Sequence, residues 1–101
     1  MDLLANKIAL ITGASRGIGK AIAEVYVEHG ACVVVGDVTR EVFAVAEAIN
    51  QGSPHRAAAV TLDVSNPEQV QAAVDTAVRE FGRLDVVVNN AGINRPHPFL
   101  E

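Results

Sequence analysis

The sequence predicts an α/β fold in which a four-stranded parallel β-sheet lies between layers of helices. Four short, nearly continuous apolar segments rich in Val, Ile or Leu recur along the 101 residues, and a helical pattern fills each gap between them. Continuous apolar segments are typical of strands buried on both faces, as in a parallel sheet. Right-handed connections between successive strands then place the helices on the faces of the sheet.

The first strand is expected at residues 7–12 and the first helix at residues 18–29. The segment KIALIT is nearly all apolar, which suits a buried strand. Apolar residues then recur at helical spacing, and Gly30 follows where a left-handed C-cap would end the helix. The apolar stripe of this helix consists of Ile18, Ala21, Ile22, Val25 and Tyr26.

The second strand, CVVVGD, is expected at residues 32–37, and the second helix at residues 40–51 with Gly52 in the cap position. The only cysteine, Cys32, begins this strand. We expect a buried structural thiol, because a free cysteine behaves as a small hydrophobic residue. The apolar stripe of the second helix consists of Val42, Val45, Ala46 and Ile49.

The third strand is expected at residues 57–63 and the fourth at residues 84–89. The helix between them has the clearest boundaries, with Asn66 as N-cap, Pro67 at the first helical position and Gly82 after the last. Its apolar stripe consists of Val70, Ala73, Val74, Ala77, Val78 and Phe81.

The composition indicates a single globular domain over residues 1–101. Half of the residues are hydrophobic, and the length allows one core but not two. A net charge of −4 without a basic cluster argues against nucleic acid as a partner. No apolar stretch approaches the roughly 18 residues of a membrane span, and the start of the chain lacks a signal-peptide pattern. We therefore expect a cytoplasmic protein with no membrane partner.

The loop of residues 12–19, TGASRGIG, has a glycine pattern typical of phosphate binding, because it directly follows a strand and opens a helix. Gly13 permits a tight turn, Gly17 leaves room for a diphosphate, and Gly19 lets the helix pack close to the strand. Backbone N–H groups and the helix dipole then face an anion. A nucleoside-triphosphate loop is disfavoured, because Gly13 comes one residue too early and Ala21 replaces the magnesium-binding Ser or Thr.

Two further motifs accompany this loop. The pattern Thr12-Gly13-x-x-x-Gly17-x-Gly19 is followed by Asp63-Val64 after the third strand and by Asn89-Asn90-Ala91-Gly92 after the fourth. In this order and spacing, the motifs resemble the N-terminal part of a classical short-chain dehydrogenase/reductase. The resemblance implies a Rossmann-type fold whose full form continues beyond Glu101. Residues 1–101 would be the NAD(P)-binding part of an oxidoreductase that interconverts alcohols and carbonyls by hydride transfer, with the catalytic C-terminal part absent.

The resemblance also assigns contacts with a nicotinamide dinucleotide. The diphosphate and ribose would be held by Gly13, Ser15, Arg16, Gly17, Ile18 and Gly19. The adenine would lie beside Asp63 and Val64, with the Asp63 carboxylate accepting a hydrogen bond from the exocyclic amine. Asn90, Ala91 and Gly92 would line a ribose of the cofactor. The residues alone leave two alternatives: Asp63 only starts the turn at residues 65–66, and Asn89 only braces the sheet.

Asp37 favours NAD over NADP as the cofactor. It ends the second strand eighteen residues after Gly19, close to the position from which a carboxylate accepts hydrogen bonds from the adenosine ribose. A 2′-phosphate would bring about −1.5 to −2 units of charge against it. Arg16 favours NADP, because a guanidinium beside the loop can pair with that phosphate. We weigh the repulsion more heavily, because like charges cost several kcal/mol and an exposed Arg can turn away.

Neither catalytic nor metal-binding residues are predicted in the chain. The resembled family uses a Tyr-x-x-x-Lys pair and a Ser, whereas the only tyrosine, Tyr26, has Gly30 four residues later and is expected to pack in the core. His29, His55 and His97 have no cysteine or acidic partner at ligand spacing.

Three functions remain open from the sequence. The first is the cofactor-binding part of an oxidoreductase, not catalytic as it stands. The second is a dinucleotide- or adenylate-binding module without catalysis, and the third is a subunit that completes its sheet with another chain. In the resembled family the strand at residues 84–89 is internal, so here we expect an exposed edge that promotes self-association or aggregation.

Overall fold

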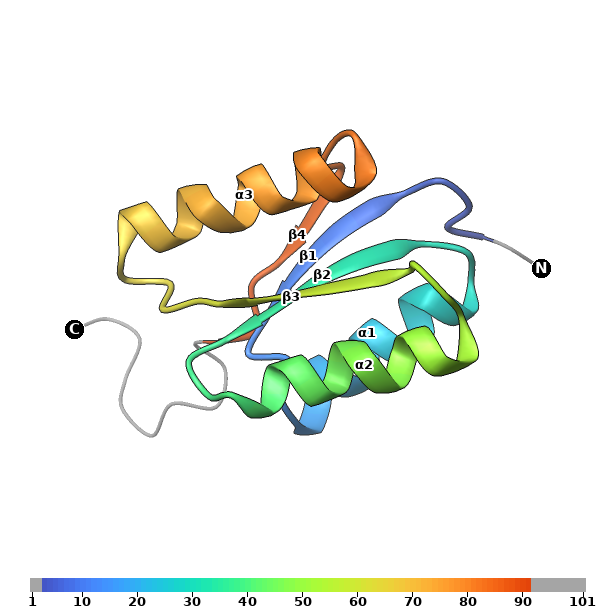
Figure 1. Ribbon diagram of the computed structural model, residues 1–101, viewed down its shortest axis with the longest axis horizontal. Helices are drawn as coiled ribbons and strands as arrows, with labels where there is room; N and C mark the ends of the chain where they lie inside the picture. The colour runs from blue at the N-terminus through green and yellow to red at the C-terminus, as the bar shows by residue number, and fades with distance from the viewer. Residues whose placement is uncertain (1–2, 92–101) are drawn as a thin grey trace.

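The computed structural model describes residues 3–91, which form a four-stranded parallel sheet covered on both faces by three helices (Figure 1). The strands lie in the order β3-β2-β1-β4. α3 covers one face of the sheet, and α1 and α2 cover the other (Figure 1). The predicted Rossmann-type α/β/α architecture is therefore confirmed. The elements are β1 (Ile8–Thr12), α1 (Gly17–Glu28), β2 (Cys32–Asp37), α2 (Glu41–Gly52), β3 (Ala57–Thr61), α3 (Pro67–Phe81) and β4 (Val86–Val88).

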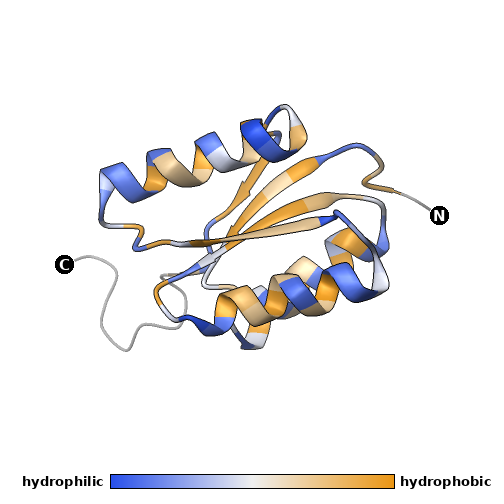
Figure 2. Cartoon of the chain, in the orientation of Figure 1, coloured by the Kyte–Doolittle hydropathy of each residue, from blue (hydrophilic) through white to orange (hydrophobic). Residues whose placement is uncertain are grey.

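Successive side chains of the central strands point to opposite faces and build two cores. In β2, Val33 and Val35 belong to the core under α1 and α2, whereas Val34 belongs to the core under α3. All five residues of β1 are buried, as its continuous apolar sequence predicts. The strands are correspondingly apolar, and hydrophilic residues gather on the helices and loops (Figure 2). No helix within residues 3–91 is long and apolar enough to cross a membrane.

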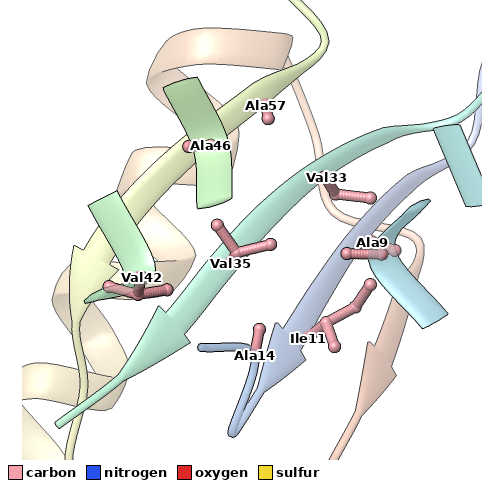
Figure 3. Packing of buried hydrophobic residues seen from close by; sticks show 9 residues of the cluster. Ala9, Ile11, Ala14, Val33, Val35, Val42, Ala46 and Ala57 are labelled. Carbon is pink, nitrogen blue, oxygen red and sulfur yellow. The ribbon is translucent and has the colours of Figure 1, made fainter. Parts of the chain in front are cut away.

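The core under α1 and α2 also anchors the glycine loop. Ala14, the second residue after β1, is fully buried and lies beside Ile11 and Val35 in Figure 3. Its backbone N–H donates to the Gly36 carbonyl at 3.2 Å. The loop is thus fixed to the sheet at its start. The buried members of this core are Ala9, Ile11, Ala14, Ala23, Val33, Val35, Val42, Ala46 and Ala57.

α1 packs on a face that coincides only in part with the predicted stripe, of which Ile22 and Tyr26 are half-buried against the core. Its buried residues are Gly19 and Ala23, whereas the side chains of Ile18 and Val25 are 55% and 49% exposed. The two small residues allow the helix backbone to approach the sheet, which turns the larger side chains outward. Tyr26 is partly buried against the core, as predicted.

α3 begins and ends where the sequence predicts. The Asn66 side-chain oxygen accepts hydrogen bonds from two backbone N–H groups of the first turn, at 3.0 and 3.2 Å. Gly82 ends the helix in the left-handed conformation with φ +94°. The stripe was wrong at Val78, which is 50% exposed, and it omitted Thr76, which is buried.

The caps of the other helices were only partly predicted. Gly30, just after α1, has φ +97° and reverses the chain as expected. Gly52 is instead the last residue of α2, because the N–H of Ser53 still bonds to the Ile49 carbonyl at 2.8 Å. The left-handed residue of this connection is His55, with φ +63°.

The outer strands are shorter than predicted. β3 ends at Thr61 because the chain turns away at Asp63, and β4 is limited to three residues that pair with β1. Val87 is 57% exposed, so within the described residues β4 forms the open edge that the sequence predicts. Cys32 is half-buried rather than buried and is the first residue of β2.

Candidate functional site

A groove with a volume of about 330 Å³ lies beyond the carboxyl ends of the strands. Loops from four parts of the chain meet there: the glycine loop, the β2–α2 connection, the segment after β3 and the segment after β4. In open parallel sheets this edge is where ligands bind. The groove is lined by Gly13, Arg16, Asp37, Val38, Thr39, Leu62, Asp63, Val64 and Ala91.

The three glycines of the loop have the geometry that their spacing predicts. Gly13 and Gly17 have φ values of +63° and +60°, which residues other than glycine rarely adopt. A Cβ atom at Gly19 would lie 2.2 Å from the Gly13 carbonyl oxygen, so α1 and the loop are in close contact there. By contrast, nothing lies within 4 Å of a Cβ atom placed at Gly17. The backbone at Gly17 is therefore open to a ligand.

The N-terminus of α1 adjoins this open space. Arg16 is the N-cap residue in an extended conformation, and its side chain makes no capping hydrogen bond. The first turn contains no acidic residue. The first N–H groups of a helix have no partner within the helix, and the dipole places partial positive charge on them. An uncapped N-terminus beside an open glycine loop suits a phosphate or diphosphate.

Asp37 has a second role that the sequence did not reveal. Its Oδ2 atom accepts a hydrogen bond from the Ser15 backbone N–H at 3.0 Å, and its Oδ1 atom accepts from the Val38 N–H at 2.7 Å. Asp37 therefore lines the groove and also ties the glycine loop to the end of β2. Each carboxylate oxygen can accept more than one hydrogen bond, so these contacts leave capacity for ribose hydroxyls.

Two side-chain pairs extend this link between the glycine loop and the β2–α2 connection. The hydroxyl groups of Ser15 and Thr39 are hydrogen-bonded at 2.7 Å. The Arg16 Nη2 atom lies 2.8 Å from Glu41 Oε1 at the start of α2. Ser15 is buried, so its side chain lies beneath the groove surface, whereas Arg16 is exposed along the rim. Thr39 and Glu41 were not predicted.

Asp63 lies in the groove wall but starts a local turn. Its Oδ1 atom accepts hydrogen bonds from the backbone N–H and the hydroxyl of Ser65, at 2.9 and 2.6 Å. Its own N–H donates to the side chain of Gln69 at 2.8 Å. The turn expected as an alternative is thus present. Because Asp63 and the half-buried Val64 also line the groove, the turn holds both residues where an adenine contact is expected.

Asn90 is completely buried behind the glycine loop. Its side-chain Nδ2 atom donates to the Gly13 carbonyl at 3.1 Å, whereas its Oδ1 atom has no hydrogen-bond partner within residues 3–91. Thr12, which the sequence did not single out as a contact residue, accepts hydrogen bonds from the N–H groups of Asn90 and Ala91 at 2.9 and 3.0 Å. This network positions the loop and the segment after β4 against each other. It places Asn90 below the groove rather than on its surface.

Of the remaining predicted contact residues, the structure describes Ala91 and Ile18. Ala91 lines the groove, and its Cα atom lies 3.0 Å from a Cβ atom placed at Gly13, so the two backbones are in close contact. The exposed side chain of Ile18 is not among the groove residues, and Gly92 and His97 lie outside the described residues. Within residues 3–91 no group of three or more His, Cys, Asp or Glu side chains is placed to hold a metal ion.

Comparison with known proteins agrees with this geometry. Residues 7–101 match the family model for short chain dehydrogenase. The chain is 46% identical over 101 residues to the oxidoreductase UcpA of Salmonella typhimurium, covering all of this chain and 38% of the relative. The chain therefore spans well under half the length of this curated relative.

Two solved structures superpose closely on the chain. L-sorbose reductase from Gluconobacter frateurii, complexed with NADPH and L-sorbose, gives a TM-score of 0.85 at 36% identity, covering 100% of this chain and 39% of the reductase. The C-domain of a bacterial malonyl-CoA reductase with NADP gives a TM-score of 0.83 at 34% identity, covering 90% of this chain and 15% of that protein.

Proposed function

The chain belongs to the short-chain dehydrogenase family, and from this premise we propose that its groove binds a nicotinamide dinucleotide. The observation that carries the proposal is the open backbone at Gly17 beside the uncapped N-terminus of α1, since this combination suits a diphosphate. The glycine loop would hold the diphosphate through backbone N–H groups. The Asp37 carboxylate would receive the adenosine ribose, and Asp63 and Val64 would border the adenine.

We also propose a role for each of the other residues expected to contact the cofactor. Ser15 and Asn90 are buried, so they would support the loop from below rather than cover the ligand. Ala91 would line the ribose wall, where its small side chain leaves space, and Gly92 would continue this wall. Arg16 and the exposed Ile18 would contact the cofactor from the rim.

We propose NAD as the preferred cofactor, with NADP second. The carboxylate of Asp37 supports this choice, because it would repel a phosphate on the ribose that it binds. The two solved structures described above contain NADP or NADPH, which supports the opposite choice. Among the groove residues that the structure describes, the one with a positive charge, Arg16, is already paired with Glu41. We therefore propose that NAD is the preferred cofactor, and titration with both nucleotides tests this preference.

The domain formed by residues 1–101 is proposed to be the cofactor-binding part of an oxidoreductase that interconverts an alcohol and a carbonyl. The similarity to longer oxidoreductases supports the reaction class. By itself the chain is proposed not to transfer hydride, because its only tyrosine packs against the core. We further propose that the open edge of β4 drives self-association, because unpaired apolar edges recruit other strands.

Calorimetric titration with NAD, NADH, NADP and ADP-ribose tests the binding function. We expect at least one ligand to bind at millimolar concentration or below. Gly19→Ala should weaken binding by displacing the loop, whereas Gly52→Ala is the matched control, because its added Cβ meets no atom within 4 Å. A folded wild-type chain that binds none of the four ligands would disprove the proposal.

A further inference from the structure

The ion pair between Arg16 and Glu41 lies at the ribose end of the proposed site. Arg16 lines the same groove as Asp37, and the N–H of the preceding residue, Ser15, is hydrogen-bonded to the Asp37 carboxylate. A phosphate on a ribose held by Asp37 would therefore find Arg16 as its neighbouring cation within the groove lining. Arg40 is exposed in the adjacent connection and does not line the groove.

Glu41 competes with such a phosphate for Arg16. The Nη2 and Oε1 atoms of the pair are 2.8 Å apart, so one arm of the guanidinium is engaged. Guanidinium groups bind phosphate best when two parallel N–H donors are available. This competition for Arg16 acts against NADP and leaves NAD, which has no 2′-phosphate, nearly unaffected.

The backbone holds Glu41 in reach of Arg16. The Ser15–Thr39 hydroxyl pair at 2.7 Å and the Asp37–Ser15 hydrogen bond at 3.0 Å tie the glycine loop to the connection that leads into α2. Glu41 is the first residue of α2, where an acidic side chain is also favoured by the helix dipole. These hydrogen bonds between the glycine loop and the β2–α2 connection therefore keep the side chains of Arg16 and Glu41 close together.

Resting on the proposed function, we propose that Glu41 is a positioning residue that lowers the affinity for NADP by holding Arg16. The side chains of Arg16 and Glu41 are 74% and 60% exposed, so solvent screens the pair and its effect is small. Removing the charge of Glu41 should strengthen NADP binding about two- to five-fold at low salt and change NAD binding less.

The test is calorimetric titration of NAD and NADP with Glu41→Gln, Arg16→Gln and the double variant, at low ionic strength. Glu47→Gln is the matched control, because Glu47 is exposed on the same helix but does not line the groove. Arg40→Gln tests the other nearby cation. We expect Glu41→Gln to shift the affinity ratio toward NADP, and the shift to vanish in the Arg16→Gln background and at high salt.

Three results would overturn the inference: an unchanged ratio in Glu41→Gln, an equal shift in Glu47→Gln, or a shift that persists without Arg16. Each of these leaves the proposed function intact, because NAD or NADP still binds. Failure of the folded wild-type chain to bind either nucleotide would instead overturn the proposed function and this inference together.

Discussion

Replacing Gly19 with Ala should destabilise the fold more than any other small change to the glycine loop. The new Cβ atom would lie 2.2 Å from the Gly13 carbonyl oxygen and 2.6 Å from Asn90 Nδ2. Contacts of this kind below 3.0 Å are essentially not found in proteins, so α1 and the loop would have to separate by about 0.8 Å. The obstructing oxygen belongs to the backbone, so a rotamer change of one side chain cannot relieve the clash.

The cost has two sources. Overpacking of a close contact typically destabilises a protein by about 1–3 kcal/mol. Separation of the loop from Asn90 would also weaken the 3.1 Å hydrogen bond to the Gly13 carbonyl, which contributes about 1 kcal/mol. We therefore expect the free energy of unfolding to fall by about 2–4 kcal/mol. For a small domain with a total stability of about 5–15 kcal/mol, this is a large fraction.

Urea denaturation followed by circular dichroism measures this loss. Gly52→Ala serves as the control, because the added methyl group meets no atom within 4 Å and should change the stability by less than about 0.5 kcal/mol. Nucleotide binding is measured on the folded fraction of each variant. If Gly19→Ala unfolds at the same urea concentration as Gly52→Ala, the close contact between α1 and the loop is not a feature of the folded protein.

Four further outcomes are expected. Asp37→Asn should shift the NAD to NADP affinity ratio toward NADP by removing a negative charge, as titration with both nucleotides would measure, and an unchanged ratio would assign the preference elsewhere. The hydrogen bond from the Ile8 N–H, together with Arg83, holds the pKa of Asp85 below its ordinary value of 3.8, so its stabilisation is present above that pH and lost as the pH falls through the lowered pKa. The stability difference between wild type and Asp85→Asn should accordingly shrink in acid, and a constant difference in urea denaturation from neutral to acid pH would contradict this. Val87→Lys should reduce self-association in sedimentation experiments by placing a charge on the open edge of β4, and a monomeric wild type at high concentration would refute the premise. The purified chain should not oxidise NADH with ketones, sugars or thioesters, and steady turnover proportional to its concentration would reveal a catalytic group among these 101 residues.

The sequence predicts the fold well where the signals are local. α3 has its predicted boundaries because Asn66, Pro67 and Gly82 act within one turn of the helix ends. The stripe predicted for α1 was only partly right, because Ile22 and Tyr26 pack against the core whereas Ile18 and Val25 are exposed. The contact with the sheet depends on how closely the backbones approach, which selects Gly19 and Ala23.

The candidate site likewise combines local features that the sequence predicts with distant contacts that it does not. The glycine positions follow from spacing within one loop, and their left-handed backbone and close contacts agree with that pattern. The partners that tie the loops together are distant in the sequence: Thr39 pairs with Ser15, and Thr12 pairs with Asn90. Nothing in the spacing of these residues indicates that they meet, because the sheet order that joins them is a property of the whole fold.

The position of Asp37 explains why its two roles must be separated by the choice of substitution. Its carboxylate holds the Ser15 N–H at 3.0 Å and lies in the groove proposed for the ribose. Asp37→Ala would therefore release the glycine loop as well as remove the charge, so both nucleotides would bind more weakly and the ratio would be hard to interpret. Asn keeps one acceptor oxygen, which can still accept from the Ser15 N–H, so it removes the charge and gives up only the hydrogen bond from the Val38 N–H. If Asp37→Asn shifts the NAD to NADP affinity ratio with little loss of NAD affinity, the cofactor preference is electrostatic. If the binding of both nucleotides weakens equally, Asp37 only supports the loop.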